Sequence, residues 1–122
     1  MAKRSLIAVV DDDESVRESL PDLLRAFGFA VEAFSSAKEF LASGCLARID
    51  CLILDIAMPE MSGPDLQREL HLRGQEVPIV FITAHASGNV RPRVLAQGAV
   101  DCLYKPFSQA ALLEALGAAL AL

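Results

Sequence analysis

Short runs of apolar residues, each ending at a polar or turn-forming residue, recur at intervals along the chain. Three of them, at residues 6–10, 51–54 and 77–82, are nearly continuous, which is typical of strands buried on both faces of a sheet. Residues 30–34 alternate like a half-buried strand, and residues 99–104 form a further strand-like run. The pattern therefore predicts five strands.

The segments between these runs carry apolar residues at helical spacing. They predict helices over residues 15–27, from a capping box at 36–39 to 43–44, over 63–73, over about 91–97, and from 109 to the end. Pro21 lies inside the first of these, where it removes a backbone hydrogen bond, so we expect a kink or a divided helix there. In the weakly patterned segment 86–98 we expect a loop through Asn89 and then Pro92 in the first turn of a short helix.

Strand and helix alternate five times along the chain. This order predicts an α/β domain with a five-stranded parallel sheet, helices on both faces, and right-handed crossovers. We expect residues 1–122 to form one domain, because the length suits a single core and no linker or repeat interrupts the pattern. Since the last helix runs to the end, we expect no output domain after it in this chain.

Polar side chains follow four of the predicted strands at the point where each strand ends. They are Asp11 and Asp12, Asp55, Thr83, and Lys105. Because the carboxyl ends of parallel strands share one edge of a sheet, we expect these side chains to lie together where α/β proteins bind ligands. Asp13 and Glu14 follow at once and are interpreted as the solvated start of a helix. A solvated loop is also the alternative for Asp11 and Asp12.

The residue types at this edge favour phosphoryl chemistry. Three carboxylates repel one another and need a cation at neutral pH, and oxygen ligands without histidine or cysteine suit Mg²⁺. Lys105 offers a positive charge and Thr83 a hydroxyl group to a phosphoryl group. Asp55 is the candidate to accept that group as an acyl phosphate, because it ends the central buried run between the acid pair and the Thr83/Lys105 side.

These motifs together resemble the receiver domain of bacterial two-component response regulators, over about residues 5–121. The matching pieces are residues 9–13, 54–59, 61–63, 82–85, 98–99 and 105–107. The residues in these segments are most similar to those of the subfamily whose receivers often precede a helix-turn-helix output domain. The resemblance implies a three-layer, doubly wound, flavodoxin-like (βα)5 fold with strand order 2-1-3-4-5.

The resemblance also implies a function and a set of site residues. Such a protein accepts a phosphoryl group from a phosphohistidine of a sensor kinase or phosphotransfer protein, and it catalyses only its own phosphorylation and dephosphorylation. Asp55 would be the phosphoacceptor. The other implied residues are Asp12, Asp55 and the Ala57 carbonyl as direct Mg²⁺ ligands, Asp11 as a ligand through water, and Thr83 and Lys105 as phosphoryl-binding groups.

Three positions depart from the family pattern. Ala57 replaces a polar residue that usually tunes the lifetime of the phosphoryl group, and only its backbone is needed for the metal. Cys102 stands where an aromatic residue usually rotates with Thr83 in signalling, although Tyr104 lies on the same strand face and is the alternative aromatic. Pro92 interrupts the fourth helix. The phosphorylation chemistry is therefore expected to be intact, with an altered switch at Thr83 and Cys102.

Composition argues against several other kinds of protein. A net charge of −5 argues against direct, sequence-independent binding of nucleic acid, and 53% hydrophobic residues argue against disorder. No apolar run is long enough to span a membrane, and no signal peptide is recognisable. The three cysteines lack the CxxC spacing of metal or redox sites, so we expect buried thiols and a cytoplasmic location.

Other functions fit the pattern less well. A Mg²⁺-dependent aspartyl phosphatase on a similar sheet needs a second acid two residues after its nucleophile, where this chain has Ala57. A dinucleotide-binding enzyme would carry G-x-G-x-x-G after its first strand, and this motif is absent. A phosphorylation-independent interaction module is the remaining alternative, and Cys102 mildly favours it.

The last helix is unusually apolar, since Glu114 is the only charged residue from position 110 to 122. Leu112, Leu116 and Leu120 form a stripe that we expect to pack on the sheet, with Ala115 facing outward. An apolar exposed side would indicate a homodimer, or docking of an output domain, through the last helix, the fifth strand and the neighbouring fourth helix. The alternative is that alanine serves here only as a good helix former.

Overall fold

The computed structural model describes residues 4–84 and 89–121. Within these ranges the elements are β1 (Leu6–Val10), α1 (Glu14–Ala26), β2 (Ala30–Phe34), α2 (Ala37–Ala42), the short 3₁₀ turn η1 (Cys45–Ala47), β3 (Cys51–Asp55), α3 (Gly63–Leu72), β4 (Ile79–Thr83), α4 (Val90–Ala96), β5 (Asp101–Tyr104) and α5 (Gln109–Leu120). Part of the loop expected before Asn89, and the last residue of the expected final helix, lie outside the described residues.

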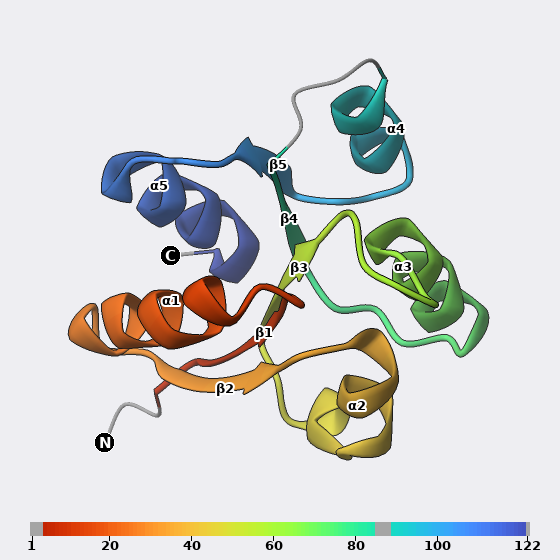
Figure 1. The fold of residues 1–122 in the computed structure, drawn as a ribbon, viewed down its shortest axis with the longest axis horizontal. Coiled ribbons are helices and arrows are strands. Elements are labelled where there is room, and N and C mark those ends of the chain that lie inside the picture. The colour runs from red at the N-terminus through yellow and green to blue at the C-terminus, as the bar shows by residue number, and fades with distance from the viewer. Residues whose placement is uncertain (1–3, 85–88, 122) are drawn as a thin grey trace.

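The five strands form one parallel sheet in the order β2-β1-β3-β4-β5. Figure 1 shows α1 and α5 on one face of this sheet and α2, α3 and α4 on the other. Each face is covered by its own buried apolar cluster, with Phe40, Phe81 and Leu66 in one and Ile53, Leu24 and Leu112 in the other. The predicted three-layer flavodoxin-like architecture and its strand order are confirmed.

Short polar side chains start the helices. The side chains of Asp13, Ser36, Ser62 and Ser108 each accept a hydrogen bond from a backbone N–H in the first turn of α1, α2, α3 and α5. The cap predicted at Ser36 is confirmed, although Glu39 accepts from the Ser35 N–H and not from that of Ser36, so the capping box is not complete. These caps fix where each helix leaves the carboxyl edge of the sheet, and so they fix the direction of the loops around that edge.

The first helix is not divided at Pro21. α1 runs without interruption from Glu14 to Ala26, with Pro21 buried beside Leu20 and Leu24 on its inward face. Packing of that face against the sheet offsets the hydrogen bond that proline removes. The helix ends at Phe27 and is followed by Gly28, whose φ of 97° lies in the left-handed region that favours glycine.

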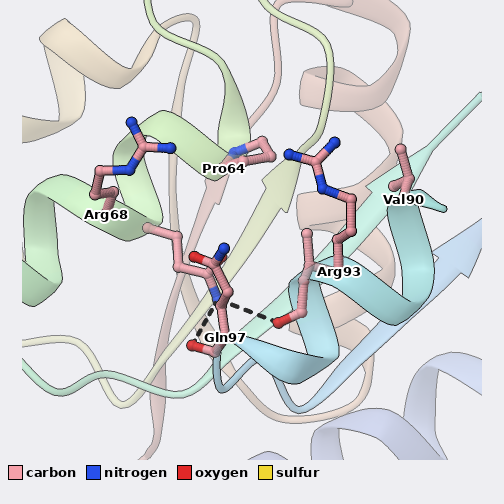
Figure 2. Close-up of a pocket in the computed structure, with 7 residues that line it drawn as sticks. Pro64, Arg68, Val90, Arg93 and Gln97 are labelled. Atoms are coloured by element: carbon pink, nitrogen blue, oxygen red, sulfur yellow. Dashed lines mark hydrogen bonds between the residues drawn. The ribbon is translucent and has the colours of Figure 1, made fainter.

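Helices α3 and α4 face each other across a small cleft (Figure 2). Pro64, Gln67 and Arg68 line it from α3, and Val90, Arg93, Val94 and Gln97 line it from α4 and its end. The buried Gln67 amide joins the two helices, because its Nε2 donates to the carbonyl oxygens of Val94 at 3.5 Å and Gln97 at 3.4 Å. The Val94 carbonyl also accepts from the backbone N–H groups of Gln97 and Ala99, so the Gln67 amide adds a contact between helices to a helix end that is already capped.

Strand β5 lies at one edge of the sheet, next to β4. There Arg91 donates from Nε to the Cys102 carbonyl at 3.3 Å and from Nη2 to Asp101 Oδ1 at 3.0 Å. The Cys102 N–H donates to the same Asp101 oxygen at 2.8 Å. Side chains of the chain itself therefore occupy both backbone polar groups of Cys102.

No helix within residues 4–84 and 89–121 is long and apolar enough to cross a membrane.

Candidate functional site

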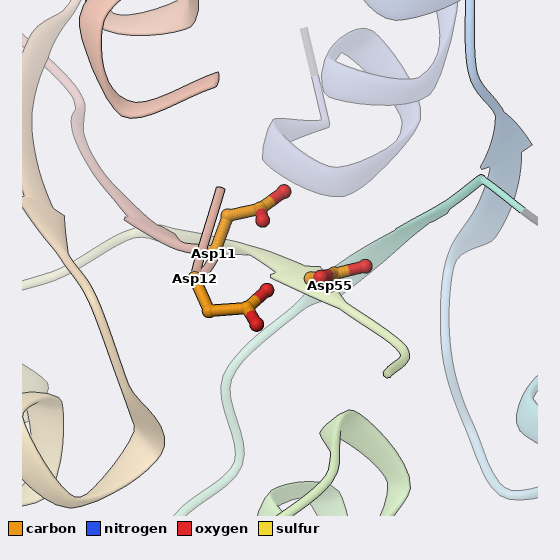
Figure 3. Close-up of side chains that lie close together, drawn as sticks. All are labelled: Asp11, Asp12 and Asp55. Atoms are coloured by element: carbon orange, nitrogen blue, oxygen red, sulfur yellow. The ribbon is translucent and has the colours of Figure 1, made fainter. Parts of the chain in front are cut away.

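Three carboxylates meet at the carboxyl edge of the sheet (Figure 3). Asp11 and Asp12 follow β1, and Asp55 is the last residue of β3. Each offers a ligand atom, and these atoms all lie within 4.8 Å of one another. Asp11 is fully buried and Asp55 is 6% exposed, whereas Asp12 is exposed. The structure thus brings together the acid pair and the central aspartate, as the strand-end pattern predicts.

The register of the sheet produces this meeting. Val10 pairs with Leu54 across β1 and β3, so the next residues, Asp11 and Asp55, leave the sheet side by side. Asp11 is then fixed by its neighbours: its Oδ1 accepts from the Asp13 N–H at 2.9 Å, and its carbonyl accepts from Arg17 Nη1 at 3.1 Å. The sequence did not predict this hydrogen bond from Arg17, because the pattern does not show that the Arg17 side chain on α1 reaches the end of β1.

Lys105 reaches the carboxylates from the end of β5. Its Nζ lies 2.9 Å from Asp11 Oδ2 and 3.8 Å from Asp55 Oδ1. Its backbone N–H donates to the Thr83 carbonyl at 2.8 Å, and its peptide bond to Pro106 is cis. The lysine is only 19% exposed, so it supplies a largely desolvated positive charge between two acids.

The electrostatics of the site are dominated by negative charge. Burial is the main reason that the pKa of Asp55 is raised to about 7, and the charge of Asp11 raises it further against the opposing effect of Lys105. For Lys105, burial disfavours the charged form, yet the hydrogen bond to Asp11 and the charges of Asp11 and Asp55 raise its pKa above the ordinary value. One ammonium group therefore does not balance three carboxylates.

The carboxylate group fits a divalent cation of the Mg²⁺ type. It offers only hard oxygen ligands, it leaves Asp12 open to solvent, and it gathers three carboxylates beside a single ammonium group. Such an ion keeps several waters and needs only one or two carboxylates, which the exposed side of this group allows. Ala57 lies in the exposed loop two residues after Asp55.

The loop after Asp55 is shaped by close packing that the sequence pattern did not reveal. A Cβ atom on Gly63 would overlap the Asp55 carbonyl oxygen and would lie 2.9 Å from Phe81 Cε1. The Gly63 N–H donates to the Ile56 carbonyl at 2.9 Å, and Glu60 takes a left-handed φ of 67° within the same loop. Glycine at position 63 thus lets α3 begin directly against the end of β3.

The expected switch positions lie in the core. Thr83 is the last residue of β4, and Cys102 in β5 pairs in register with Phe81; both side chains are 2% exposed. Tyr104, the alternative aromatic residue, pairs in register with Thr83 and is 40% exposed. The β5 residue paired with Thr83 is therefore the exposed Tyr104, and the buried Cys102 thiol belongs to the residue paired two positions earlier.

One expectation about the last helix is wrong. Leu112 and Leu116 are buried against the sheet as predicted, but Ala115 is also buried, at 2% exposed, instead of facing outward. The apolar face of α5 is wider than the leucine stripe, because Ala115, three residues after Leu112, extends the inward arc on the side of Leu112 away from Leu116. The outward apolar positions are Ala110, Leu113 and Ala118.

Comparisons with known proteins agree with this geometry. The family model for the response regulator receiver domain matches residues 7–117. The chain is similar to the response regulator protein TodT of Pseudomonas putida, with 45% identity over 98% of this chain and 53% of TodT. Among solved structures, the response regulator StyR has a TM-score of 0.90 and 44% identity, covering 98% of this chain and 60% of that one.

A structure of FixJ-N is also similar, with a TM-score of 0.87 and 34% identity, and the match covers 98% of this chain and 96% of that one. The chain spans about half the length of the curated relative TodT. The family model covers most of the described residues. The chain therefore belongs to the response regulator receiver domain family of two-component signal transduction.

Proposed function

We propose that this receiver domain accepts a phosphoryl group on Asp55 in a Mg²⁺-dependent reaction and thereby changes its interactions with partners. The donor is a phosphohistidine of a sensor kinase or a phosphotransfer protein. The observation that carries the proposal is the position of the Asp55 carboxylate, beside Asp11 and Asp12 on one side and 3.8 Å from the Lys105 ammonium on the other. This arrangement can hold a phosphoryl group among opposite charges.

The transfer forms one bond and breaks one. A carboxylate oxygen of Asp55 attacks the phosphorus, the bond between phosphorus and the donor nitrogen breaks, and the histidine leaves as a neutral imidazole with a proton from solvent. Lys105 neutralises one phosphoryl oxygen, and Thr83 donates a hydrogen bond to another. Because both residues end neighbouring strands, a small movement brings them onto the phosphoryl group.

The residues proposed to hold Mg²⁺ are Asp12, Asp55 and the Ala57 carbonyl directly, with Asp11 acting through water. When bound, the ion supplies positive charge to the phosphoryl oxygens and relieves the repulsion among the carboxylates. The fully buried Asp11, hydrogen-bonded to the Asp13 N–H and to Lys105, is the least free of the three acids to move. That difference supports its indirect role.

Incubation with acetyl phosphate tests the proposal directly. With Mg²⁺, intact mass spectrometry should show one added phosphoryl group that hydroxylamine removes, as expected of an acyl phosphate. Without Mg²⁺, or after Asp55→Asn, the addition should disappear. If phosphorylation persisted in Asp55→Asn, Asp55 would not be the acceptor. A domain that took up no phosphoryl group under any of these conditions would favour the alternative of a phosphorylation-independent interaction module.

Signalling from this site is expected to be unconventional at Cys102. A thiol is smaller than an aromatic ring, so a buried-to-exposed swing of that side chain should not accompany activation. Beryllofluoride, which imitates the phosphoryl group, should leave the rate of reaction of Cys102 with a thiol reagent nearly unchanged. An increase by orders of magnitude would contradict this part of the proposal. The exposed Tyr104 would then be the next residue to examine.

We propose, in addition, that the protein self-associates through α5, β5 and the neighbouring α4. We also propose that it is located in the cytoplasm and that this domain does not bind nucleic acid. The support is the outward apolar side of α5, where Leu113 is 42% exposed. Sedimentation at tens of micromolar, with and without beryllofluoride, measures this directly. Ala118→Glu, which changes an exposed position, should weaken the dimer without unfolding the domain. A strict monomer in both states would exclude the homodimer.

A further inference from the structure

The cleft between α3 and α4 shares none of its lining residues with the carboxylate site. Its enclosed space is small, about 40 Å³, and the rest of it is open to solvent. Its floor is partly apolar, with Pro64, Val90 and Val94, and its rim carries the two arginines, Arg68 and Arg93 (Figure 2). A space of this size admits the end of one side chain, so a larger ligand would lie mainly across the mouth of the cleft.

A buried polar atom in this cleft lacks a partner. Gln67 is 7% exposed, and its Oε1 has no hydrogen-bond partner in the described part of the chain. The orientation of the amide is fixed by Nε2, which donates to the carbonyl oxygens of Val94 and Gln97. Reversing the amide would place Oε1 against both carbonyls, so the unpaired acceptor cannot be removed in that way. A buried acceptor of this kind is destabilising until a donor reaches it.

The same cleft carries uncompensated positive charge. Arg68 and Arg93 are exposed, and neither forms an ion pair across the residues that the structure covers, although the net charge of the chain is −5. Asp65 lies three residues before Arg68 on α3, and its pKa is lowered mainly by its hydrogen bonds with Ser62 and only slightly by the charge of Arg68. In Figure 2 the two guanidinium groups extend on either side of Pro64.

We propose that this cleft binds an extended, acidic peptide segment of a partner protein. A carboxylate of the segment lies between Arg68 and Arg93, where guanidinium groups form charge-assisted hydrogen bonds. A backbone N–H of the same segment donates to Gln67 Oε1 after the Gln97 side chain, which lines the cleft and is exposed, moves aside. An apolar neighbour of the acidic residue packs on Val90 and Val94. The inference goes beyond phosphoryl transfer and does not depend on it.

A peptide matches the cleft better than a simple anion does. Inorganic phosphate can neutralise the arginines, but it offers no amide N–H and no apolar side chain. A peptide carries an acid, an N–H donor and an apolar group within a few ångströms of one another, which is the combination that the cleft lacks. Recognition of acidic motifs by arginine pairs is a general mode of peptide binding.

The test is a titration followed by ¹H–¹⁵N NMR, with an acetylated and amidated tetrapeptide of alternating leucine and glutamate as the probe. We expect saturable shifts of α3 and α4 amides and of the Gln67 side-chain amide, with a Kd of about 1 mM. Arg68→Gln and Arg93→Gln should each weaken binding about fivefold. The matched control is Arg73→Gln, which removes the same charge near the end of α3 from an arginine already paired with Glu69 at 2.7 Å and should leave Kd unchanged.

Two further arms decide the chemistry of the ligand. A peptide with glutamine in place of glutamate should not bind, and inorganic phosphate should shift the arginine region without moving the Gln67 side-chain amide. The proposal is overturned if no saturable shift occurs, if the glutamine peptide binds equally well, or if Arg73→Gln weakens binding as much as Arg68→Gln. It is also overturned if phosphate alone reproduces all the shifts, because the cleft would then be a small-anion site. Circular dichroism melts confirm that each variant is folded.

Discussion

The Lys105 ammonium donates to Asp11 at 2.9 Å and lies farther, at 3.8 Å, from Asp55. In this form the lysine is held by the fully buried acid next to the proposed phosphoacceptor and not by the acceptor itself. Lys105 thus forms its hydrogen bond with Asp11, and its contact with Asp55 Oδ1 is an ion pair at longer distance. The pairing keeps a positive charge within 3.8 Å of the proposed phosphoacceptor.

This pairing predicts a specific effect of Lys105→Ala. Without metal, the unfolding free energy should fall by about 3 kcal/mol, because Asp11 would be left buried without its cation. Mg²⁺ should restore part of that stability by binding to the folded state, while phosphorylation by acetyl phosphate stays impaired. Urea unfolding with EDTA or Mg²⁺ measures the difference. The control is Lys38→Ala at an exposed position of α2, and an equal effect there would contradict the prediction.

Asp12 should contribute to metal affinity and little to stability, since it is exposed and belongs to the carboxylate group. Asp12→Ala should weaken Mg²⁺ binding by at least about tenfold, which is the smallest effect expected for a direct ligand. Calorimetric titration with Mg²⁺ gives the affinity. Glu14→Ala is the control, because it removes an acid from the first turn of α1, outside the carboxylate group. Parent-like binding by Asp12→Ala would refute the ligand assignment.

Gly63→Ala should disturb both stability and the site. Its new Cβ would collide with the Asp55 carbonyl oxygen and crowd Phe81, so the unfolding free energy should fall by about 2 kcal/mol. Phosphorylation should slow as well, since Asp55 would be displaced. Gly117→Ala is the matched control: no atom lies within 4 Å of the added Cβ, and alanine in a helix should raise stability by about 0.5–1 kcal/mol. Thermal melts of the two variants should therefore move in opposite directions.

The buried thiols predict a loss of stability at alkaline pH. Burial raises the pKa of Cys51 to about 12, and burial together with the hydrogen bond to Glu32 does the same for Cys45. The ordinary pKa of a cysteine is 9.0, so between pH 9 and pH 12 the unfolded chain releases protons that the folded protein retains. The contribution of these thiols to stability should thus be constant below about pH 9 and should fall above it, by about 1.4 kcal/mol per thiol at pH 10.

Unfolding of the parent and of Cys51→Ala between pH 7 and pH 10 isolates this effect, because other alkaline groups are common to both. The variant should be less stable at pH 7 and should lose less stability on going to pH 10. An identical pH slope in the two proteins would show that Cys51 has an ordinary pKa in the folded state.

Much of this fold was predictable because the chain is locally consistent. The continuous run before Asp55 specifies a strand buried on both faces, and parallel pairing then brings Asp11 to Asp55 without further information. The helix caps at Ser36 and Ser108 were predictable for a similar reason, since their partners lie within one turn. Features that depend on neighbours close in sequence, or on strand ends, were therefore accessible.

Features that depend on contacts between separate elements were not accessible. Alanine occurs on both the buried and the exposed faces of helices, so the residue type at position 115 does not indicate its side. The packing of α5 against the sheet shows that Ala115 is buried. The collision that requires glycine at position 63 involves the Asp55 backbone and the ring of Phe81, which is 18 positions farther along the chain. The unpaired oxygen of Gln67 likewise arises only when α4 lies against α3.

The contacts of Arg91 with Asp101 and Cys102 have a consequence for how copies of this domain can assemble. An edge strand normally offers its free backbone groups as a template on which a strand of another molecule can add. Here the Cys102 N–H and carbonyl are already bonded to side chains of the same chain, so the sheet cannot grow outward from the middle of β5. Any association across this edge must therefore join helices and side chains and not extend the sheet, which leaves it reversible and protects the domain from polymerising through its backbone.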